Sequence, residues 1–519
     1  MKCCSLLLCL LLLPACQLDT RPLETAHQPN IVLILVDDLG WQDTSVAFTE
    51  EATPFQGRYR TPKLERMARA GVRFSNAYAS GSVCTPTRSA LLTGQSPARS
   101  HISDWTLYQN QDFSRPMETL SDPDWCKAGV TPSPDLLPEL LRAQGYRTIF
   151  IGKAHFGARG TDGANPLQLG FDVNIAGHAA GAPGSYFATD SFGAKDDNPW
   201  GVPGLDAYHG KEMFLTEALT LEMERELEVA AKDGRPFFLD FSHYAVHTPI
   251  QADPRFASAY REAGLDEKEA AYASLIEGVD VSLGRLLTKL EQLHLADDTL
   301  IIFTSDNGGL SAHGRGKTPS GTGKDTHNAP LRSGKGSGYE GGIRVPFVVA
   351  WAGQVLGHSP LVSRQTPASI LPLQAGRLDD TPIITSDLFV TLARLGGVTT
   401  ERMASTNPEG LDLRDLLSGN TELPARFLAW NYPHKWGPEG DGYQPFTALR
   451  KGDWKIIHWY EKGSWELYNL VSDLGEQVDC MLTEPEVAAN MQGLLRSWMV
   501  EVGAQRPVDK ATGEMLPIP

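Results

Sequence analysis

Cysteine is scarce in most of this 519-residue chain. Four of its seven cysteines lie within the first sixteen positions, and only Cys84, Cys126 and Cys480 occur beyond them. So few cysteines in so long a chain exclude a fold held together by a disulfide framework. If Cys84 has a chemical role, Cys126 and Cys480 either pair with each other or stay free, and the sequence leaves both outcomes open.

Positive charge is also in deficit. The chain has 46 Lys and Arg against 63 Asp and Glu, which gives a formal net charge of −17. A strongly acidic protein is repelled by nucleic acid and has no general attraction for other polyanions. We therefore expect no nucleic-acid partner, and any attraction for an anionic substrate must be local.

Long hydrophobic runs are missing beyond the N-terminus, so no segment there is predicted to span a bilayer. The apolar run Leu6–Leu13 follows Met1 and Lys2, which is the layout of a secretory signal. The letters LPAC at 13–16 resemble a bacterial lipobox, whose cysteine, here Cys16, is lipidated. We expect an exported protein of the periplasm or cell surface, either lipid-anchored to the outer membrane through Cys16 or released by ordinary signal cleavage.

The length of the chain exceeds what one hydrophobic core usually supports. We expect a signal or lipoprotein segment at 1–16, a linker at 17–28, an α/β catalytic domain at 29–424 and a smaller α+β subdomain at 425–519. In the large domain apolar strands alternate with amphipathic helices, which predicts a large, mostly parallel sheet flanked by helices. The expected strands are Ile31–Val36, Arg147–Ile151, Pro236–Phe241, Thr299–Thr304 and Val345–Trp351, and the main helices are Pro62–Ala70, 134–144, 211–231 and 267–294.

The C-terminal part of the chain has a different pattern of short strands and turns. Gly452 and Asp453 form a predicted hairpin turn, and an amphipathic helix is expected near 484–502. This pattern predicts a small antiparallel sheet packed with one helix. Its expected strands are Phe427–Asn431, Thr447–Lys451, Trp454–Tyr460 and Trp465–Leu470.

Oxygen-bearing side chains follow two of the predicted strands. Asp37 and Asp38 come directly after Ile31–Val36, and Asp306 and Asn307 follow the strand that begins at Thr299. Open α/β sheets bind ligands at the carboxyl ends of their strands. Carboxylate and amide oxygens are typical ligands of Ca²⁺ or Mg²⁺, and the lack of a His/Cys cluster argues against zinc.

The stretch SVCTPTRSALLTG at 82–94 puts Cys84 immediately before a predicted helix that Pro86 opens and Gly94 closes. A cysteine at a helix N-terminus has its thiolate stabilised by the helix dipole, which favours a nucleophile. Arg88 lies one turn further along. For an isolated cysteine, a buried and inert side chain would be the favoured interpretation.

Three further stretches carry candidate side chains: GYRTIFIGKAH at 145–155 with Lys153 and His155, HYAVHTP at 243–249 with His247, and RSGKGSGYEGGIRVP at 332–346 with Lys335. Considered alone, Lys153 and His155 would be solvated loop residues. The Gly-rich loop around Lys335 does not have the strand, loop and helix spacing of a phosphate-binding P-loop, so nucleotide binding is discounted.

Together these stretches resemble the type I, formylglycine-dependent sulfatase family, whose C-x-P-x-R pattern matches Cys84 to Arg88. The resemblance runs from Ile31 to ELYNLVSD at 466–473. It departs at Ala154, where the family commonly has an aromatic residue. It implies an alkaline-phosphatase-like fold, and conversion of Cys84 to formylglycine (3-oxoalanine) by a formylglycine-generating or anaerobic maturating enzyme.

The resemblance also implies the roles of the site residues. The metal ion, Ca²⁺ rather than Mg²⁺, would be held by Asp37, Asp38, Asp306, Asn307 and the formylglycine made from Cys84. The hydrated aldehyde would attack sulfur, with Arg88 and the cation favouring its ionised oxygen, while Lys153 and Lys335 bind the sulfuryl oxygens. His247, assisted by Lys335, would protonate the leaving oxygen, and His155 would take a proton from the remaining hydroxyl so that sulfate is expelled.

For the substrate, the stretches 177–186 and 430–434 look like those of carbohydrate sulfatases of the N-acetylgalactosamine, galactose and arylsulfatase A type. The resemblance implies a sulfated carbohydrate, with His178 and His434 as candidate sugar contacts or else packed or solvated histidines. The Gly-rich stretch 308–342 is either a substrate-facing lid or a mobile surface loop. Two other functions stay open: a phosphodiesterase or phosphonate hydrolase of the same superfamily, and a silent glycan-binding lipoprotein in which Cys84 is unmodified.

Overall fold

A computed structural model describes residues 28–519 except 51–52, 196, 317–325, 359–370, 421–422 and 438–439. The predicted signal segment and Cys16 lie outside the described residues, as does the middle of the expected 308–342 lid. Within the described ranges, no helix combines the length and apolar character needed to cross a membrane.

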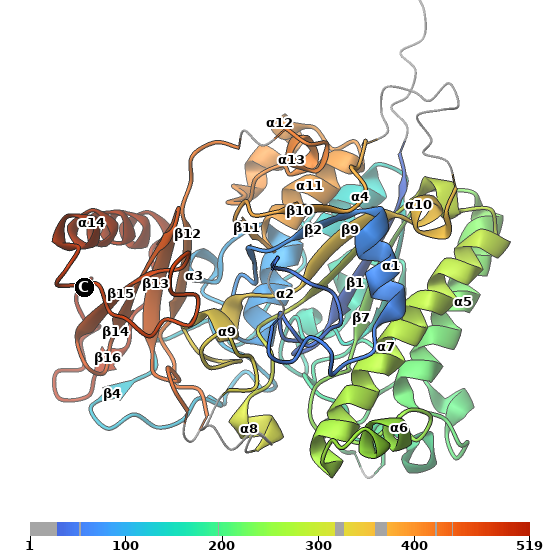
Figure 1. The fold of residues 1–519 in the computed structure, drawn as a ribbon, viewed down its shortest axis with the longest axis horizontal. Helices are drawn as coiled ribbons and strands as arrows, with labels where there is room; N and C mark the ends of the chain where they lie inside the picture. The colour runs from blue at the N-terminus through green and yellow to red at the C-terminus, as the bar shows by residue number, and fades with distance from the viewer. Residues whose placement is uncertain are drawn as a thin grey trace, which may run out of the picture.

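An eight-stranded mixed sheet forms the centre of the molecule (Figure 1). Five strands in the order β8, β1, β7, β5, β6 are parallel neighbours and reach the β6 edge of the sheet, and β9 pairs antiparallel with both β8 and β2. The strands are β1 (Asn30–Val36), β2 (Val72–Phe74), β5 (Arg147–Gly152), β6 (Val173–Ile175), β7 (Phe237–His243), β8 (Thr299–Ser305), β9 (Phe347–Trp351) and β10 (Arg377–Asp379). All five expected strands are present, which confirms the predicted mixed, mostly parallel sheet.

Strand β1 shows why the sheet is covered on both faces. Every one of its residues is buried, and alternate side chains belong to two different hydrophobic clusters. Val32, Ile34 and Val36 lie in one cluster, while the odd-numbered Ile31, Leu33 and Leu35 lie in the other. A continuous apolar run is what a parallel strand between two helical layers requires.

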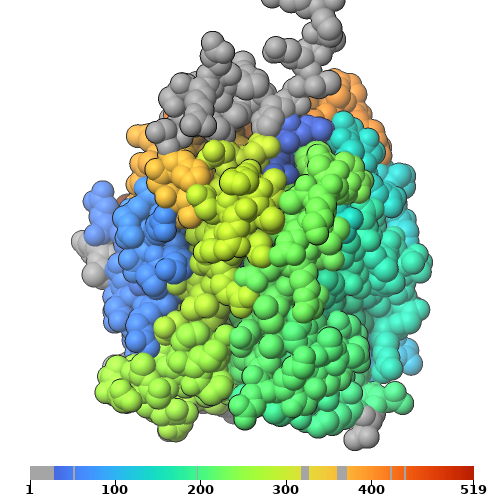
Figure 2. All heavy atoms as spheres, turned by 90° about the vertical axis from the view of Figure 1, so that its right-hand side faces the viewer, coloured from blue at the N-terminus to red at the C-terminus, as the bar shows by residue number. Residues whose placement is uncertain are grey.

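The two helical layers lie on opposite faces of the sheet (Figure 1). In Figure 2 the long helices α5 and α7 run side by side and form one outer face of the molecule. One layer contains α1 (Pro62–Ala70), α5 (Leu215–Asp233), α7 (Glu267–Gln292) and α10 (Ala352–Leu356), and the other contains α2 (Cys84–Thr93), α4 (Leu137–Ala143) and α11 (Asp387–Leu395).

A four-stranded antiparallel sheet and helix α14 (Pro485–Val502) form the C-terminal part, as predicted (Figure 1). One face of this C-terminal sheet packs on α14. The other face packs on the segment that leads to Cys84, where the Trp430 indole donates a hydrogen bond of 2.8 Å to the Ala79 carbonyl. Its strands are β12 (Leu428–Tyr432), β13 (Phe446–Lys451), β14 (Trp454–Trp459) and β15 (Ser464–Asn469).

Gly152 ends β5 at a point where a side chain has no room. Its φ is 109°, and an added Cβ would lie 1.8 Å from the Ser242 carbonyl oxygen on β7. The Lys153 backbone N–H donates to the same oxygen at 2.8 Å. We expect Gly152→Ala to lower the free energy of unfolding by about 1–3 kcal/mol and to shift the strand end that carries Lys153.

Gly145→Ala is the matched control for this prediction. Gly145 also has a positive φ, 93°, but no atom lies within 4 Å of an added Cβ. The control therefore measures the backbone cost alone. Chemical unfolding of the two variants separates the effects, and equal losses of stability would contradict the crowding argument.

Candidate active site

Polar loops at the carboxyl ends of four neighbouring strands meet at one edge of the central sheet. Strands β8, β1, β7 and β5 are adjacent and parallel, so the residues that follow them are brought together. These residues are Asp306 and Asn307 after β8, Asp37 and Asp38 after β1, His247 after β7, and Lys153 and His155 after β5.

Asp37 and Asp38 both lie in the site although they are consecutive. Successive side chains of an extended strand point to opposite faces. Asp38 has a φ of 60°, in the left-handed region, so the chain turns immediately after Asp37. Asp tolerates this conformation better than most residues, and such strain is common at functional sites. Both carboxylates are fully buried.

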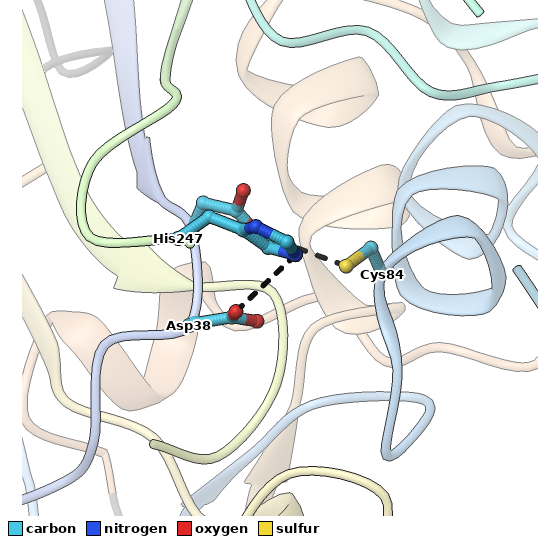
Figure 3. Close-up of side chains that lie close together, drawn as sticks. Asp38, Cys84 and His247 are labelled. Carbon is cyan, nitrogen blue, oxygen red and sulfur yellow. Dashed lines mark hydrogen bonds and ion pairs between the residues drawn. The ribbon is translucent and has the colours of Figure 1, made fainter. Parts of the chain in front are cut away.

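Cys84 faces this acidic edge from the start of α2, and Figure 3 shows its sulfur pointing toward Asp38 and His247. The Cys84 Sγ lies 3.7 Å from Asp37 Oδ1 and 3.4 Å from Lys335 Nζ. The sequence predicted that this helix opens at Pro86, but in the structure it begins two residues earlier, at Cys84. Cys84 therefore lies in the first helical turn, where the helix dipole favours an anion.

Three buried cations pair with the three buried carboxylates of the site. Lys153 Nζ lies 2.6 Å from Asp37, and Lys335 Nζ lies 2.7 Å from Asp38. Arg88 Nε lies 2.8 Å from Asp306 Oδ2, and its Nη1 donates to the Lys153 carbonyl at 2.6 Å. Buried ions need such partners because the desolvation of an unpaired charge is costly.

The carboxylates differ in how easily they ionise. Burial raises the pKa of Asp37 well above its usual range, because Lys153 only partly offsets burial and the neighbouring carboxylates. Burial is the largest single influence on Asp38 and Asp306 too, but neighbouring cations together exceed it, with Lys335 foremost at Asp38 and Arg88 foremost at Asp306, so both pKa values lie below normal. Asp37 is therefore the position where additional positive charge would stabilise the site most.

The oxygen atoms of this edge fit a divalent metal ion. Donor atoms of Asp37, Asp38, Cys84 and His247 all lie within 4.8 Å of one another. Asp37 Oδ2 and Asn307 Oδ1 are buried without any hydrogen-bond partner. Asn307 Nδ2 donates to Asp38 Oδ1 at 2.8 Å, which leaves its carbonyl oxygen available. Buried acceptors without donors suit a cation, and oxygen donors of this kind suit Ca²⁺ or Mg²⁺.

His155 and His247 each have one ring nitrogen bound to a carbonyl oxygen, which can only accept. His155 Nε2 donates to Thr106 O at 2.8 Å, so the neutral ring has its lone pair at Nδ1, which is buried without a partner. Burial, together with Lys153, lowers the pKa of His155 well below normal. His247 Nδ1 donates to Thr248 O at 2.8 Å, and its Nε2 lies 3.5 Å from Asp38 Oδ2.

A pocket of about 530 Å³ opens onto Cys84. Three tryptophans in its wall, Trp105, Trp200 and Trp436, escaped the sequence analysis, because nothing in their local sequence distinguishes them from packed tryptophans. The lining residues are Val83, Cys84, Trp105, His155, Gly181, Ala182, Pro183, Gly184, Asn198, Trp200, His247, Thr248, Pro249, Lys335 and Trp436.

The two candidate sugar-binding histidines lie outside this lining. His434 is fully buried, and its ring nitrogens bond Ser103 Oγ at 2.8 Å and Asp122 Oδ1 at 3.0 Å. His178 accepts a hydrogen bond from the His155 backbone through its own carbonyl, at 3.0 Å, and packs against Tyr244. In this structure both histidines support neighbouring parts of the site and do not reach the pocket.

The remaining cysteines also have a defined state. Cys126 and Cys480 are both free, so the open question of their pairing is answered: they do not form a disulfide. Cys84 is free as well and is the one of the three that is fully buried. Oxidation of Cys84 therefore has no competing disulfide partner among the described cysteines.

A buried cysteine beside an acidic edge that fits a metal ion, at the carboxyl ends of a mostly parallel sheet, is the arrangement of the alkaline-phosphatase-like fold. The chain belongs to the sulfatase family, whose model, Sulfatase, matches residues 29–398. It is thus a sulfuric ester hydrolase, and the resemblance inferred from its motifs is confirmed.

Individual relatives agree with this assignment. A sulfatase of Formosa agariphila is 27% identical over 555 residues, which cover 96% of this chain and 93% of that protein. Human N-acetylgalactosamine-6-sulfatase is 31% identical over 386 residues, which cover 72% of this chain and 62% of that protein.

Among solved structures, the chain is similar to that of Ps i-CgsB, with 26% identity, a TM-score of 0.69 and coverage of 91% of this chain and 93% of that one. A second structure of that protein, 25% identical and with the same TM-score of 0.69, contains k-i-k-neocarrahexaose.

Proposed function

We propose that this sulfatase removes an O-sulfate group from a sulfated carbohydrate, such as a galactose or N-acetylgalactosamine residue, with formylglycine at position 84 and Ca²⁺ as its metal ion. One observation carries the proposal: Cys84 lies at a pocket of about 530 Å³, with Lys335 Nζ 3.4 Å from its sulfur. The relatives that act on or bind carbohydrates support the choice of substrate.

Asp37, Asp38, Asp306 and Asn307 would hold the calcium ion, together with the oxygen that replaces the Cys84 sulfur. When present, formylglycine supplies a hydrated aldehyde as nucleophile, and calcium supplies positive charge beside the sulfate. The fit rests on the unpartnered Asp37 Oδ2 and Asn307 Oδ1 atoms.

The cationic side chains bind and orient the sulfate in this proposal. Lys153 pairs with Asp37 and Lys335 pairs with Asp38, and both ammonium groups would turn from these carboxylates to contact sulfuryl oxygens. Arg88 is fixed by Asp306 and by the Lys153 carbonyl, so it holds its charge next to position 84. Fixed charges of this kind stabilise a transition state without reorganisation.

The histidines handle protons. His155 lines the pocket and has an unprotonated Nδ1 without a partner, which would accept the proton from the hydroxyl that remains on residue 84. His247 directs Nε2 toward Asp38 and would hold the proton that the departing sugar oxygen receives. A sugar alkoxide is a poor leaving group, so its protonation matters for the rate.

His247→Gln is expected to reduce turnover of a sugar sulfate by about 10²–10⁴-fold, the usual contribution of a general acid. Turnover of 4-nitrophenyl sulfate should fall far less, because 4-nitrophenolate leaves without protonation. Steady-state kinetics with both substrates measures the difference. Equal losses for the two leaving groups would assign His247 to binding or structure instead.

Comparing aryl sulfate with aryl phosphate tests the proposed function. We expect hydrolysis of 4-nitrophenyl sulfate and of sulfated galactose or N-acetylgalactosamine, with much slower release from 4-nitrophenyl phosphate. Faster phosphate release would favour the phosphodiesterase or phosphonate hydrolase.

Peptide mass spectrometry across 82–88 on protein from a maturation-competent cell is expected to find formylglycine. An unmodified Cys84 together with binding of sulfated glycans would favour the silent binding protein.

We also propose export to the periplasm or cell surface, with Cys16 as the site of lipidation and maturation of Cys84 by a formylglycine-generating or anaerobic maturating enzyme. The support is the layout of residues 1–16, Lys2 followed by an apolar run and LPAC. Metabolic labelling with a radioactive fatty acid tests the anchor, since Cys16→Ala should abolish the label. The proposed domains, 29–424 and 425–519, follow the change of pattern near residue 425.

A further inference from the structure

Tryptophan rings form much of the wall around the reacting position. Trp105 lies beside His155, with ring centres 6.3 Å apart, and its ring is also 6.4 Å from that of Trp200. Phe113 supports Trp105 from behind at 4.2 Å. Both tryptophans are half-buried, so each keeps an exposed ring surface in the pocket lining. Aromatic surfaces in a pocket bind the apolar C–H faces of a ligand.

Trp436 forms the wall on the side of Lys335 and comes from the loop after β12 of the C-terminal sheet. Lys335 Nζ lies 5.4 Å from the centre of its ring. The ring rests on Gly336, where an added Cβ would lie 2.0 Å from Trp436 Cδ1. His313 packs against it edge-on at 5.7 Å. The C-terminal part of the chain thus supplies a rigidly held residue to the pocket.

Charged groups are nearly missing from this wall. Among the pocket-lining residues that the structure describes, Lys335 is the only Lys or Arg, and none is Asp or Glu. Lys335 already pairs with Asp38 at 2.7 Å and belongs to the sulfate-binding set. A second anionic group on the same sugar would find no free Lys or Arg among the described lining residues, and desolvation of that group would be costly.

We infer that the pocket selects a sugar whose only charge is the sulfate that is removed, a neutral hexose or N-acetylhexosamine, and that Trp436 is a specificity-determining residue. This inference rests on the proposed carbohydrate sulfatase function and goes beyond it. The neutral ring would stack on the tryptophans, whereas a uronate or a residue with a second sulfate would be rejected. Specificity then arises from exclusion of charge as well as from contact.

The test uses matched pairs of hexosamine O-sulfates that differ only at nitrogen, N-acetylated against N-sulfated, with the full-length matured enzyme. The panel covers several sulfate positions in galactosamine and glucosamine. For whichever position is hydrolysed, we expect kcat/KM to be at least about tenfold higher for the N-acetylated member. Equal or faster turnover of the N-sulfated member overturns the inference.

Variants of the wall complete the test. Trp436→Ala is expected to raise KM for the preferred sugar about 10–100-fold with kcat within a few-fold, and Trp436→Phe to restore most of the loss. Trp465→Ala is the control: Trp465 is half-buried in the C-terminal sheet and packs against His458, outside the pocket.

The outcomes distinguish failure of the proposed sulfatase function from failure of the proposed selection for a neutral sugar. If the matured enzyme cleaves neither aryl nor sugar sulfates, both proposals are wrong. An enzyme that cleaves sugar sulfates without regard to a second charge keeps the proposed function and removes the inference. A KM that is unchanged in Trp436→Ala, or changed equally in Trp465→Ala, removes Trp436 as the specificity determinant.

Discussion

Replacing Cys84 by alanine is expected to reduce kcat for aryl and sugar sulfates by about 10⁴-fold or more, the usual cost of losing a nucleophile. The polar side chains around its sulfur are Asp37, Asp38, His247 and Lys335, and none of them supplies the hydrated aldehyde on which the proposed reaction depends. The pocket keeps its shape, since Cys84 contributes only its small side chain to the lining.

Binding is expected to survive this substitution. Equilibrium binding of a sulfated sugar to Cys84→Ala should stay within a few-fold of the wild type, because Lys335 and the tryptophan wall remain. Cys126→Ala and Cys480→Ala serve as controls, since both cysteines are free and lie outside the pocket. We expect their kcat within about twofold of the wild type. Turnover of Cys84→Ala close to the wild-type rate would remove the nucleophile from position 84.

Removal of the metal ion is expected to abolish activity and to lower stability at the same time. Burial and the neighbouring carboxylates raise the pKa of Asp37 although Lys153 partly offsets them, so the folded site gains when a divalent cation binds there. Calcium at about 100 times its Kd should raise the free energy of unfolding by about 2.7 kcal/mol. Chelation followed by titration with Ca²⁺ or Mg²⁺, read by thermal unfolding and by turnover, measures both effects.

A matched pair of carboxylate variants checks this interpretation. Asp37→Asn should lose most of the Tm rise on calcium addition, because the amide carries no charge. Asp206→Asn is the control, since the Asp206 side chain is 86% exposed and its ion-pair partner is His209, which does not belong to the site. It should keep the full response. If Asp37→Asn keeps the full Tm rise on calcium addition, the metal ion binds elsewhere. If only Mg²⁺ restores turnover and Tm after chelation, the metal ion is Mg²⁺ and not Ca²⁺.

Much of the fold could be predicted from periodicity alone. The continuous apolar runs predicted the buried strands β1, β7 and β8, and the short alternating strands predicted the C-terminal sheet. The direction of β9 was not predictable, because an apolar run has no preferred orientation and β9 pairs antiparallel with β8. The short strands β3 (Ala77–Tyr78) and β6 (Val173–Ile175) were missed as well, since segments of two or three residues carry no pattern of their own.

Some residues of the candidate site could be predicted from the sequence, and the surroundings of others could not. Asp37, Lys153 and Asp306 were found because each follows a strand in a dense motif. His434 looked like a sugar contact from its motif, yet Ser103 and Asp122, distant in sequence, enclose it. No local signal could have foretold this, because the partners of a buried histidine come from other parts of the chain.

The sequence by itself determined which chemistry this protein carries: the positions of its main strands along the chain, the oxygen donors at their ends, and a cysteine at the start of a helix. These are local properties, because strand ends, helix caps and motif spacing depend on neighbouring residues. Tertiary structure alone decided the substrate pocket. Trp105, Trp200 and Trp436 come from three separate segments, and the packing of the C-terminal sheet against the segments 78–83 and 339–343 brings Trp436 beside Lys335. Long-range packing sets such a wall, and a linear sequence does not display it.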